Sequence, residues 1–336
     1  MSVRSAVLGA GSWGTTFAKL LCDAGGEVTL WGRRAEIVEA VNNDHENPDY
    51  LPGVALPEGL RATTDPGDAL KGAEYVVLAV PAQTLRQNLA EWRAALPDDA
   101  VLVSLIKGVE LGTCKRMSEV IQEVADVSED RVAVVSGPNL ARELAQGQPS
   151  ASVVACTSER CAQDLQAACM TSYFRAYTNT DVIGVELGGS IKNIIALCVG
   201  IAVGLGFGDN TRALLMTRGL AEIARLGAAL GADQHTFSGL AGLGDLVGTC
   251  SSPQSRNRTF GENLGKGMTL REVIAMTKQT AEGVKSSEAV LELARKHSVE
   301  MPITEVVAAV VHRGMSIEEA AMRLMSRSPK PERYGV

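Results

Sequence analysis

The sequence lacks the residue patterns that build metal and disulfide sites. Its four histidines, His45, His235, His297 and His312, are scattered and unpaired, which gives a metal site little support because such sites need clustered ligands. None of its seven cysteines forms a C-x-x-C pair. We expect them to be reduced core residues of a cytosolic protein. The sequence therefore predicts no metal and a cytoplasmic location.

Long hydrophobic runs and a basic charge balance are also missing. The most apolar run, residues 194–205, is short and is broken by Gly200 and Gly204, so it predicts a buried helix and no membrane span. Residues 1–4 lead directly into the first predicted strand, and we expect no secretory signal peptide. The net charge is -7, and an acidic surface argues against nucleic acid or an anionic membrane as the main partner.

What the sequence does have is a glycine-rich turn near its start. Gly9, Gly11 and Gly14 follow the apolar residues 6–8 with the spacing G-x-G-x-x-G and precede the apolar-periodic residues 17–21. This is the layout of a strand, a tight turn and a helix whose N-terminus holds a dinucleotide pyrophosphate. The alternative is a glycine-rich turn without a ligand. A P-loop is not expected, because no Gly-Lys-Ser/Thr closes the motif.

Two arginines follow the second predicted strand, residues 27–31. An NAD-specific unit would carry an acidic residue there for the ribose 2′-hydroxyl, but this strand is followed by Gly32, Arg33 and Arg34. Guanidinium groups bind a 2′-phosphate through charge-assisted hydrogen bonds. We therefore favour NADP(H) over NAD(H), with an ordinary solvated loop as the alternative.

Further apolar runs predict strands at 60–63, 75–80, 101–105, 132–136, 151–155 and 174–178. Continuous apolar runs are typical of strands buried on both faces of a parallel sheet. From residue 181 onward the pattern is helical and rich in Gly and Ala, with a turn-rich segment at 239–258. We predict an α/β Rossmann-type dinucleotide-binding domain over 1–180, an all-α domain over 181–328 and a polar tail over 329–336.

Two later strands are followed by residues suited to a ligand site. Lys107 follows the strand at 101–105, and the carboxyl ends of parallel strands face the crevice where ligands bind. Gly137 and Asn139 follow the strand at 132–136. Gly137 offers a backbone that a ligand can approach closely, and Asn139 offers an amide for a substrate or a helix cap. A solvated lysine and a simple cap stay open as alternatives.

Lys192 stands in the opening of an apolar helix, after the small residues 188–190. Such a lysine must be paired, reach solvent or do chemistry. Desolvation and a second ammonium, for which Lys107 is plausible, would lower its pKa toward neutrality, as a proton-transfer group requires. The small residues would allow a ligand to approach. A purely structural lysine is the alternative.

The segment 239–258 combines a carboxylate with a basic cluster. Asp245 lies among apolar and glycine residues, so we expect it to have a cationic or hydroxyl partner. Ser255, Arg256 and Asn257 supply a hydroxyl, a planar guanidinium and backbone N–H groups, which suit a phosphate. A solvated basic loop is the alternative.

These segments occur in a recognisable order. They are Gly9-Ala10-Gly11-Ser12-Trp13-Gly14-Thr15, Lys107-Gly108, Ser136-Gly137-Pro138, Lys192-Asn193, Gly244-Asp245-Leu246 with Thr249-Cys250, and Ser255-Arg256-Asn257-Arg258. Over nearly the whole chain this order resembles the bacterial NAD(P)-dependent glycerol-3-phosphate dehydrogenases. The last two segments separate that family from other two-domain dehydrogenases. Asn139 stands where Ser or Thr is expected, and Ser190-Ile191 stands where Ala-Leu or similar is common.

The resemblance implies reversible reduction of dihydroxyacetone phosphate to sn-glycerol 3-phosphate for glycerophospholipid synthesis. It implies a C-terminal domain of the 6-phosphogluconate dehydrogenase C-terminal-like type, a homodimer, and Lys192 as proton donor in reduction and acceptor in the reverse direction. It implies substrate contacts from Lys107, Gly137, Asn139, Lys192, Asn193, Asp245, Thr249, Ser255, Arg256 and Asn257. It implies contacts with NADP(H) or NAD(H) from Gly9, Gly11, Ser12, Trp13, Gly14, Arg33, Arg34, Lys107, Ala141, Arg256, Thr280 and Glu282.

Two other functions remain open at this point. One is another β-hydroxyacid-type dehydrogenase of the same architecture, whose substrate would offer a carboxylate in place of a phosphate. The other is a non-catalytic dinucleotide sensor. Lys192, Asp245 and Arg256 argue against the sensor, which has no need of that trio.

Overall fold

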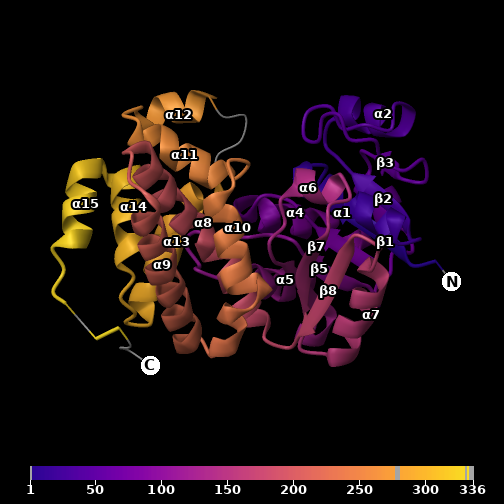
Figure 1. The fold of residues 1–336 in the computed structure, drawn as a ribbon. Coiled ribbons are helices and arrows are strands. Elements are labelled where there is room, and N and C mark those ends of the chain that lie inside the picture. Colours follow the sequence, from indigo (N-terminus) through magenta and orange to yellow (C-terminus); the bar gives the residue numbers. More distant parts are fainter. Residues whose placement is uncertain (1, 277–280, 330, 333–336) are drawn as a thin grey trace. The chain divides into compact units, whose positions relative to one another are not determined.

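A computed structural model describes residues 2–276, 281–329 and 331–332. The chain forms two compact units. Unit 1 comprises Met1–Ile106 and Met117–Val182, and unit 2 comprises Lys107–Arg116 and Ile183–Val336 (Figure 1). The ten residues 107–116 therefore belong to unit 2, although the chain enters and leaves this segment from unit 1.

Unit 1 is built on an eight-stranded sheet with the order β3-β2-β1-β4-β5-β6-β7-β8. The strands are β1 (Arg4–Leu8), β2 (Glu27–Trp31), β3 (Arg61–Thr63), β4 (Tyr75–Leu78), β5 (Val101–Ser104), β6 (Val132–Ser136), β7 (Ser150–Ala155) and β8 (Phe174–Asn179). All neighbouring pairs are parallel except β6 and β7, which are antiparallel. The order from β3 to β6 is that of a Rossmann domain, which confirms the predicted fold class.

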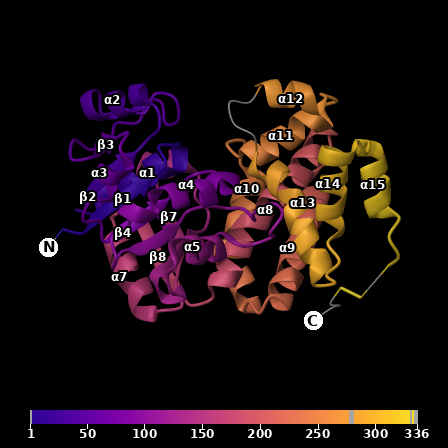
Figure 2. The same ribbon diagram turned by 180° about the vertical axis from the view of Figure 1, so that it is seen from behind.

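Helices cover both faces of this sheet. They are α1 (Ser12–Asp23), α2 (Ala35–Asn43), α3 (Pro66–Leu70), α4 (Leu85–Trp92), α5 (Met117–Ala125), α6 (Ala141–Ala145) and α7 (Glu159–Cys169), with short 3₁₀ turns η1 (Ala82–Thr84), η2 (Arg93–Ala95) and η3 (Glu129–Arg131). Successive strand residues face opposite sides. Val7 of β1 belongs to the core under α1, α2, α6 and α7, whereas Ala6 and Leu8 belong to the core under α3, α4 and α5. Figure 2 shows α4 and α5 side by side on that second face.

The glycine-rich turn joins β1 to α1 through very close packing. A Cβ at Gly14 would lie 1.9 Å from the carbonyl oxygen of Gly9, so only glycine fits in this first turn of α1. The N-cap residue is Gly11, whose extended backbone starts the helix without a side-chain hydrogen bond. The strand, turn and helix predicted from the spacing are thus present.

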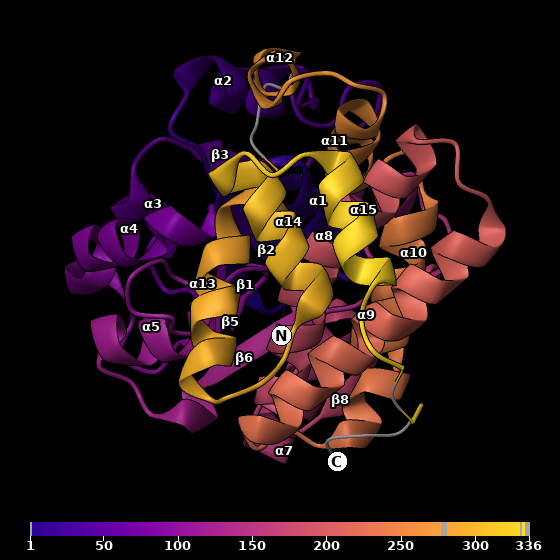
Figure 3. The same ribbon diagram turned by 90° about the vertical axis from the view of Figure 1, so that its left-hand side faces the viewer.

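Unit 2 is helical. Its helices are α8 (Val182–Gly204), α9 (Asp209–Ala229), α10 (Asp245–Ser251), α11 (Arg256–Gly265), α12 (Leu270–Met276), α13 (Glu282–Lys296), α14 (Pro302–Arg313) and α15 (Ile317–Met325), with a 3₁₀ turn η4 (Gln234–Ser238) and a π-helical turn η5 (Leu240–Gly244). Figure 3 shows α13, α14 and α15 packed in sequence order. Glu222 of α9 caps α14, because its carboxylate accepts the N–H of Ile303 at 2.6 Å and that of Thr304 at 3.2 Å.

The long helix α8 is the centre of unit 2. It is the one described helix long and apolar enough to cross a membrane, but 89% of its most apolar window is buried inside the protein, as in the core helix of a soluble protein. Its side chains, Ile191, Ile194 and Leu197 among them, lie in the core shared with α9, α11 and α13.

The segment predicted as turn-rich, residues 239–258, is more helical than its composition suggests. It contains η5, all of α10 and the start of α11. Glycine lowers helix propensity by about 1 kcal/mol per residue, so four glycines in 239–248 argue against a helix locally. Burial of Ala241, Leu246 and Cys250 in the helical unit supplies the packing that overrides this propensity.

Candidate active site

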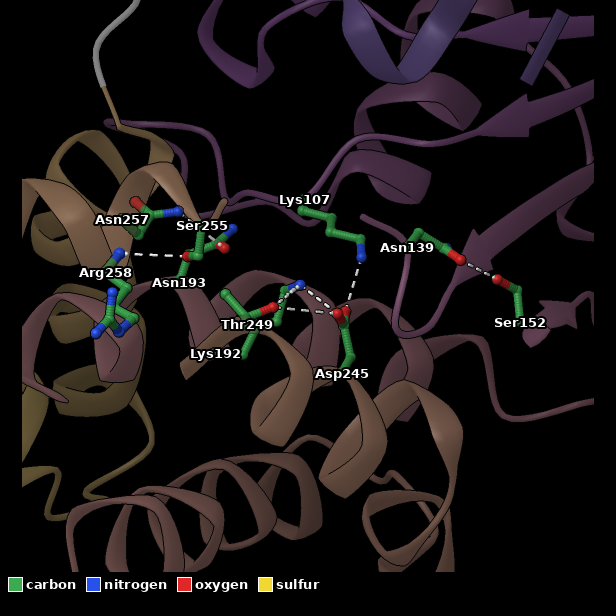
Figure 4. A network of polar contacts seen from close by, with 10 residues as sticks. All are labelled: Lys107, Asn139, Ser152, Lys192, Asn193, Asp245, Thr249, Ser255, Asn257 and Arg258. Carbon is green, nitrogen blue, oxygen red and sulfur yellow. Dashed lines mark hydrogen bonds and ion pairs between the residues drawn. The ribbon is translucent and has the colours of Figure 1, made fainter. Parts of the chain in front are cut away.

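Lys192 lies inside unit 2 with only 5% of its surface exposed. Its Nζ donates to Oδ1 of Asp245 and, at 2.7 Å, to Oγ1 of Thr249 (Figure 4). The two partners come from α10, one helical turn apart, so they face α8 from the same side. The lysine is therefore paired, and it is not one that reaches solvent.

Asp245 joins Lys192 to a second lysine. Asp245 is fully buried, and its Oδ2 accepts a hydrogen bond from Nζ of Lys107 at 2.7 Å. The Asp245 carboxylate thus lies between the ammonium groups of Lys107 and Lys192, which are 85 residues apart in the chain. The π-helical turn η5 ends directly before Asp245 and is closed by the N–H of Gly244 on the carbonyl of Gly239 at 3.1 Å. Such turns are frequent at functional sites.

Burial lowers the pKa of Lys192 far below the usual value for a lysine. Desolvation of its ammonium lowers the pKa to about 7; the charge of Asp245 acts in the opposite direction, and that of Lys107 lowers the pKa further. An amine with this pKa both holds and releases a proton near neutral pH. The arrangement can therefore transfer a proton to or from an oxygen placed beside Nζ.

The small residues before Lys192 have a packing role. A Cβ at Gly188 would lie 2.4 Å from the carbonyl oxygen of Ala241, so glycine there lets α8 touch the backbone of η5. At Gly188 this contact brings η5, and with it Asp245, close to α8. That the stretch also admits a ligand stays a prediction.

The basic segment begins α11. Ser255 is its N-cap, and its Oγ accepts the N–H of Arg258 at 3.3 Å. Asn257 is buried and binds two other elements. Its Nδ2 donates to Oδ1 of Asn193 at 3.0 Å (Figure 4), and its Oδ1 accepts the N–H of Gly283 at 2.9 Å. Asn193 directly follows Lys192, so these contacts tie the start of α11 to the helix that carries the lysine.

Arg256 is the first residue of α11 and is exposed. Its charge acts on Glu282, whose pKa is raised by burial and lowered by the nearby Lys285 and Arg256. Oε2 of Glu282 is buried without a hydrogen-bond partner. The structure thus brings Arg256 and Glu282 together, whereas Thr280, also predicted at the cofactor, lies outside the described residues.

Gly137 and Asn139 follow β6 in unit 1. Oδ1 of Asn139 accepts a hydrogen bond from Ser152 at 2.5 Å, and its Nδ2 is buried without a partner. The side chain makes no cap hydrogen bond to α6, whose N-cap is Leu140. The capping alternative for Asn139 is therefore wrong.

The glycine-rich turn fits a dinucleotide on three observations. The first turn of α1 has no side-chain cap and no acidic residue, so its N–H groups can bind an anion. A Cβ at Gly11 would meet nothing within 4 Å, which leaves open space over the turn. Nε1 of Trp13 is buried without a partner.

Two other predicted cofactor residues make hydrogen bonds next to this turn. Ser12 donates to the carbonyl of Tyr50 at 2.7 Å, and the carbonyl of Ala141 accepts a hydrogen bond from Thr16 of α1 at 3.2 Å.

The two arginines after β2 differ in their surroundings. Arg33 is exposed. Arg34 pairs with Asp49 at 2.5 Å and with Glu36 at 2.8 Å, and its guanidinium lies 6.0 Å from the centre of the Tyr50 ring. Arg33 is therefore the better candidate for a 2′-phosphate, because two carboxylates already engage Arg34.

Three residues that support the site were not predicted. Asn47 is fully buried and donates from Nδ2 to the carbonyl of Ala10 at 3.0 Å and to Thr15 at 2.8 Å, which braces the glycine-rich turn. Arg116 and Glu186 form an ion pair of 2.6 Å in unit 2. Glu186 has a sequence signal, since it is the only carboxylate in the apolar run 182–204; Asn47 and Arg116 have none.

The remaining ionisable groups do not suggest a metal. Over residues 2–276, 281–329 and 331–332, no group of three or more His, Cys, Asp or Glu side chains could hold an ion. All seven cysteines are free thiols.

Comparisons with known proteins agree with this geometry. A family model described as the NAD-dependent glycerol-3-phosphate dehydrogenase N-terminus matches residues 4–162, and the corresponding C-terminus model matches 181–322. Proteins named glycerol-3-phosphate dehydrogenase [NAD(P)+] from Streptomyces griseus and Thermobifida fusca are 67% and 66% identical to this chain. The alignment with the Streptomyces griseus protein covers 98% of each chain, and that with the Thermobifida fusca protein covers 99% of each chain. A crystal structure of glycerol-3-phosphate dehydrogenase from Coxiella burnetii is 37% identical, with a TM-score of 0.92 over 97% of this chain and 99% of that one.

Proposed function

The chain belongs to the NAD-dependent glycerol-3-phosphate dehydrogenase family, and from this premise we propose how its residues divide the reaction. The enzyme reversibly reduces dihydroxyacetone phosphate to sn-glycerol 3-phosphate with NADPH or NADH, and its product feeds glycerophospholipid synthesis. Membership decides against the two alternatives, a hydroxyacid dehydrogenase and a non-catalytic sensor. The bound nicotinamide supplies the hydride; the chain must hold the substrate, stabilise the charge on oxygen and move one proton.

Lys192 is the proton-transfer residue of this proposal. The observation that carries it is a buried lysine whose Nζ is held by Asp245 and Thr249, and whose pKa desolvation lowers to about 7. Negative charge develops on the ketone oxygen during reduction. An ammonium beside that oxygen stabilises the charge and then delivers the proton. In the reverse direction the neutral amine accepts the hydroxyl proton. Asp245 and Thr249 hold Nζ in one place, and Lys107 adds a second positive charge on the same carboxylate.

The start of α11 is the proposed phosphate site. Arg256 supplies the guanidinium, Ser255 and Asn257 hold the first turn in shape, and Asn193 links that turn to the lysine helix. We also assign Gly137 and Asn139 to the substrate; the buried, unpartnered Nδ2 of Asn139 supports this. Phosphate binding far from the reacting bond fixes the orientation of the ketone, so its binding energy contributes to the rate.

Replacing Arg256 by alanine should raise KM for dihydroxyacetone phosphate about 10–100-fold, because charge-assisted hydrogen bonds contribute roughly 1.5–3 kcal/mol. Steady-state kinetics with NADPH measure this. The activity on dihydroxyacetone, which has no phosphate, should change little in the same variant. The exposed Arg271→Ala variant on α12 serves as the control. An unchanged KM in Arg256→Ala would remove the phosphate role.

We assign the dinucleotide to the turn between β1 and α1, with Gly9, Gly11, Ser12, Trp13 and Gly14, and to Ala141, Lys107, Arg256, Thr280 and Glu282 as further contacts. The uncapped first turn of α1 and the open space over Gly11 support the pyrophosphate part. A preference for NADP(H) rests on Arg33, with Arg34 as a second guanidinium next to it.

The cofactor preference can be measured directly. Arg33→Asp should raise KM for NADPH by about tenfold or more while KM for NADH changes little, because a carboxylate repels the 2′-phosphate that the guanidinium attracts. Arg160→Asp, at an exposed position of α7, controls for the change in net charge. Equal effects on both cofactors would contradict the assignment.

We further propose that the enzyme is a cytoplasmic homodimer. Phe207, Leu214, Met322 and Met325 of unit 2 expose about half or more of their surface, and three of them line one open, mainly apolar cavity of about 450 Å³. Subunit interfaces cover surface of this kind. Seven free thiols are in keeping with a reducing compartment. Light scattering should give twice the 35.4 kDa chain mass; a stable monomer at micromolar concentration would refute the dimer.

A further inference from the structure

Residues 107–116 form a hairpin that is part of the core of unit 2. Val109 and Arg116 pair as an isolated antiparallel bridge, and the N–H of Glu110 donates to the carbonyl of Lys115 at 2.9 Å. Val109 and Cys114 are buried and belong to the same hydrophobic core as Ile191 and Ile194 of α8. The first residue of this 107–116 hairpin is Lys107, and its last is Arg116.

The 107–116 hairpin is attached to α8 at both ends. At one end the carbonyl of Gly108 accepts a hydrogen bond from Ser190 at 3.4 Å, which is near the limit for such a bond. At the other end Nη1 of Arg116 lies 2.6 Å from Oε2 of Glu186. The side chains of Arg116 and Glu186 are only 15% and 3% exposed. Glu186 and Ser190 are four residues apart and so share one face of α8.

The two attachments differ in strength. A short ion pair shielded from water is a charge-assisted contact and holds its geometry better than a neutral bond of 3.4 Å. A third contact, from Nζ of Lys296 to Sγ of Cys114 at 3.3 Å, links the tip of the hairpin to α13. Cys114 has a left-handed φ of 60°, a conformation that persists only where its surroundings hold it. The ion pair of Arg116 with Glu186 is thus the stronger of the two attachments of the hairpin to α8.

We propose that Arg116 and Glu186 are positioning residues for the dehydrogenase reaction: their ion pair holds the 107–116 hairpin against α8 and so fixes Nζ of Lys107 beside Asp245 and Lys192. The inference rests on the proposed role of Lys192. Lys107 is the first residue of this hairpin, so release of the hairpin from α8 frees the backbone from which its side chain reaches Asp245. Neither Arg116 nor Glu186 is assigned a contact with substrate or cofactor.

The electrostatics of the site give the inference a direction that can be measured. The charged and titratable groups that act on Lys192 are Asp245, Lys107 and Cys250. Of these, Lys107 lowers the pKa of Lys192, because two ammonium groups repel each other. A hairpin released from Glu186 moves Lys107 away and weakens this repulsion. The pKa of Lys192 should then rise, as it should when Lys107 is removed.

The experiment compares Arg116→Met, Lys107→Met and their double variant in the dihydroxyacetone phosphate assay over pH 6–9. Arg116→Met should lower kcat about tenfold, and its kinetic constants should change in the same direction as those of Lys107→Met, because both variants remove the Lys107 ammonium from Asp245. The limb of the kcat/KM profile near pH 7 should move upward by roughly half a unit or more in both single variants. In the double variant, loss of Arg116 should add nothing to the loss of Lys107.

Two further variants separate positioning from stability. Arg116→Met with Glu186→Gln removes both charges of this pair and should show the same shift in a fully folded protein, as followed by thermal unfolding and NADPH binding. Arg116→Lys keeps the charge and should recover part of the activity. Arg323→Met breaks an exposed pair with Glu305 and should leave kcat and the profile unchanged.

The outcomes are distinct. Suppose that Lys107→Met shifts the pH at which kcat/KM changes but Arg116→Met does not, or that the losses of kcat from the two variants add. The positioning role is then refuted while the proposed function stands. If Lys107→Met itself leaves the profile unmoved, both the assignment of the limb to Lys192 and this inference fail.

Discussion

Replacing Lys192 by alanine should lower kcat for dihydroxyacetone phosphate reduction about 10³-fold, within the range of 10²–10⁴ that general acid catalysis contributes. The variant loses both the proton donor and the buried positive charge that stabilises the developing oxyanion. Binding of NADPH should persist, because Lys192 is not among the proposed cofactor contacts and the uncapped turn of α1 belongs to unit 1. Stopped-flow or steady-state NADPH oxidation measures the loss, and fluorescence titration measures the binding.

The pH dependence adds a second readout for Lys192. The wild-type pKa of about 7 requires reduction to fall as pH rises through 7, since the donor must be protonated, and oxidation of glycerol 3-phosphate to rise over the same interval. Both limbs should vanish in Lys192→Ala. A guanidinium cannot release its proton at neutral pH, so Lys192→Arg should not restore activity.

Small primary amines offer a matched rescue, because the alanine variant leaves room where the ammonium stood. Methylamine should raise the rate of Lys192→Ala in proportion to its concentration and should not affect the wild type. The control for loss of a lysine is Lys266→Ala. Lys266 is exposed at the end of α11 and pairs with Glu262. Near-normal turnover of Lys192→Ala without added amine would remove Lys192 from the mechanism.

Local patterns in the sequence predicted the scaffold well. The G-x-G-x-x-G spacing and the apolar run before it predicted the turn between β1 and α1, because only glycine fits the contact between Gly14 and Gly9. The apolar run at 194–205 predicted a buried helix, and α8 (Val182–Gly204) contains most of this run inside the core of unit 2. Lys192 was singled out because a lysine in such a run needs a reason to be buried.

The partners of Lys192 depended on long-range contacts that a sequence pattern does not record. Asp245 is 53 residues away in the chain and was only expected to have some cation or hydroxyl nearby. Its segment was predicted as turn-rich, because its glycines lower the local helix propensity and only tertiary packing stabilises the helix there. The 107–116 hairpin gave no sign that it would join the helical unit, and the buried pair of Arg116 with Glu186 spans 70 residues.

Asp245→Asn is the second variant with a large expected effect, because Asp245 is the fully buried anion between two ammonium groups. Asparagine keeps the shape of the side chain but removes its charge. Without that charge the pKa of Lys192 should fall below 7, since the carboxylate acts to raise it, and both pH limbs should move to lower pH. We expect kcat/KM for reduction at pH 7.5 to fall about 10²–10³-fold, with Asp209→Asn on the exposed start of α9 as control.

The stability of Asp245→Asn should depend on pH in a specific direction. Breaking a buried ion pair costs about 3–5 kcal/mol when it leaves an uncompensated charge, but Lys192 can avoid this cost by releasing its proton. The folded-state pKa of Lys192 lies below its unfolded value, and more so in the variant, so protonation at lower pH favours unfolding. The difference in melting temperature between wild type and Asp245→Asn should therefore be larger at pH 6 than at pH 8.5. A difference that does not change with pH would mean that Asp245 acts on the fold alone and does not set the protonation of Lys192.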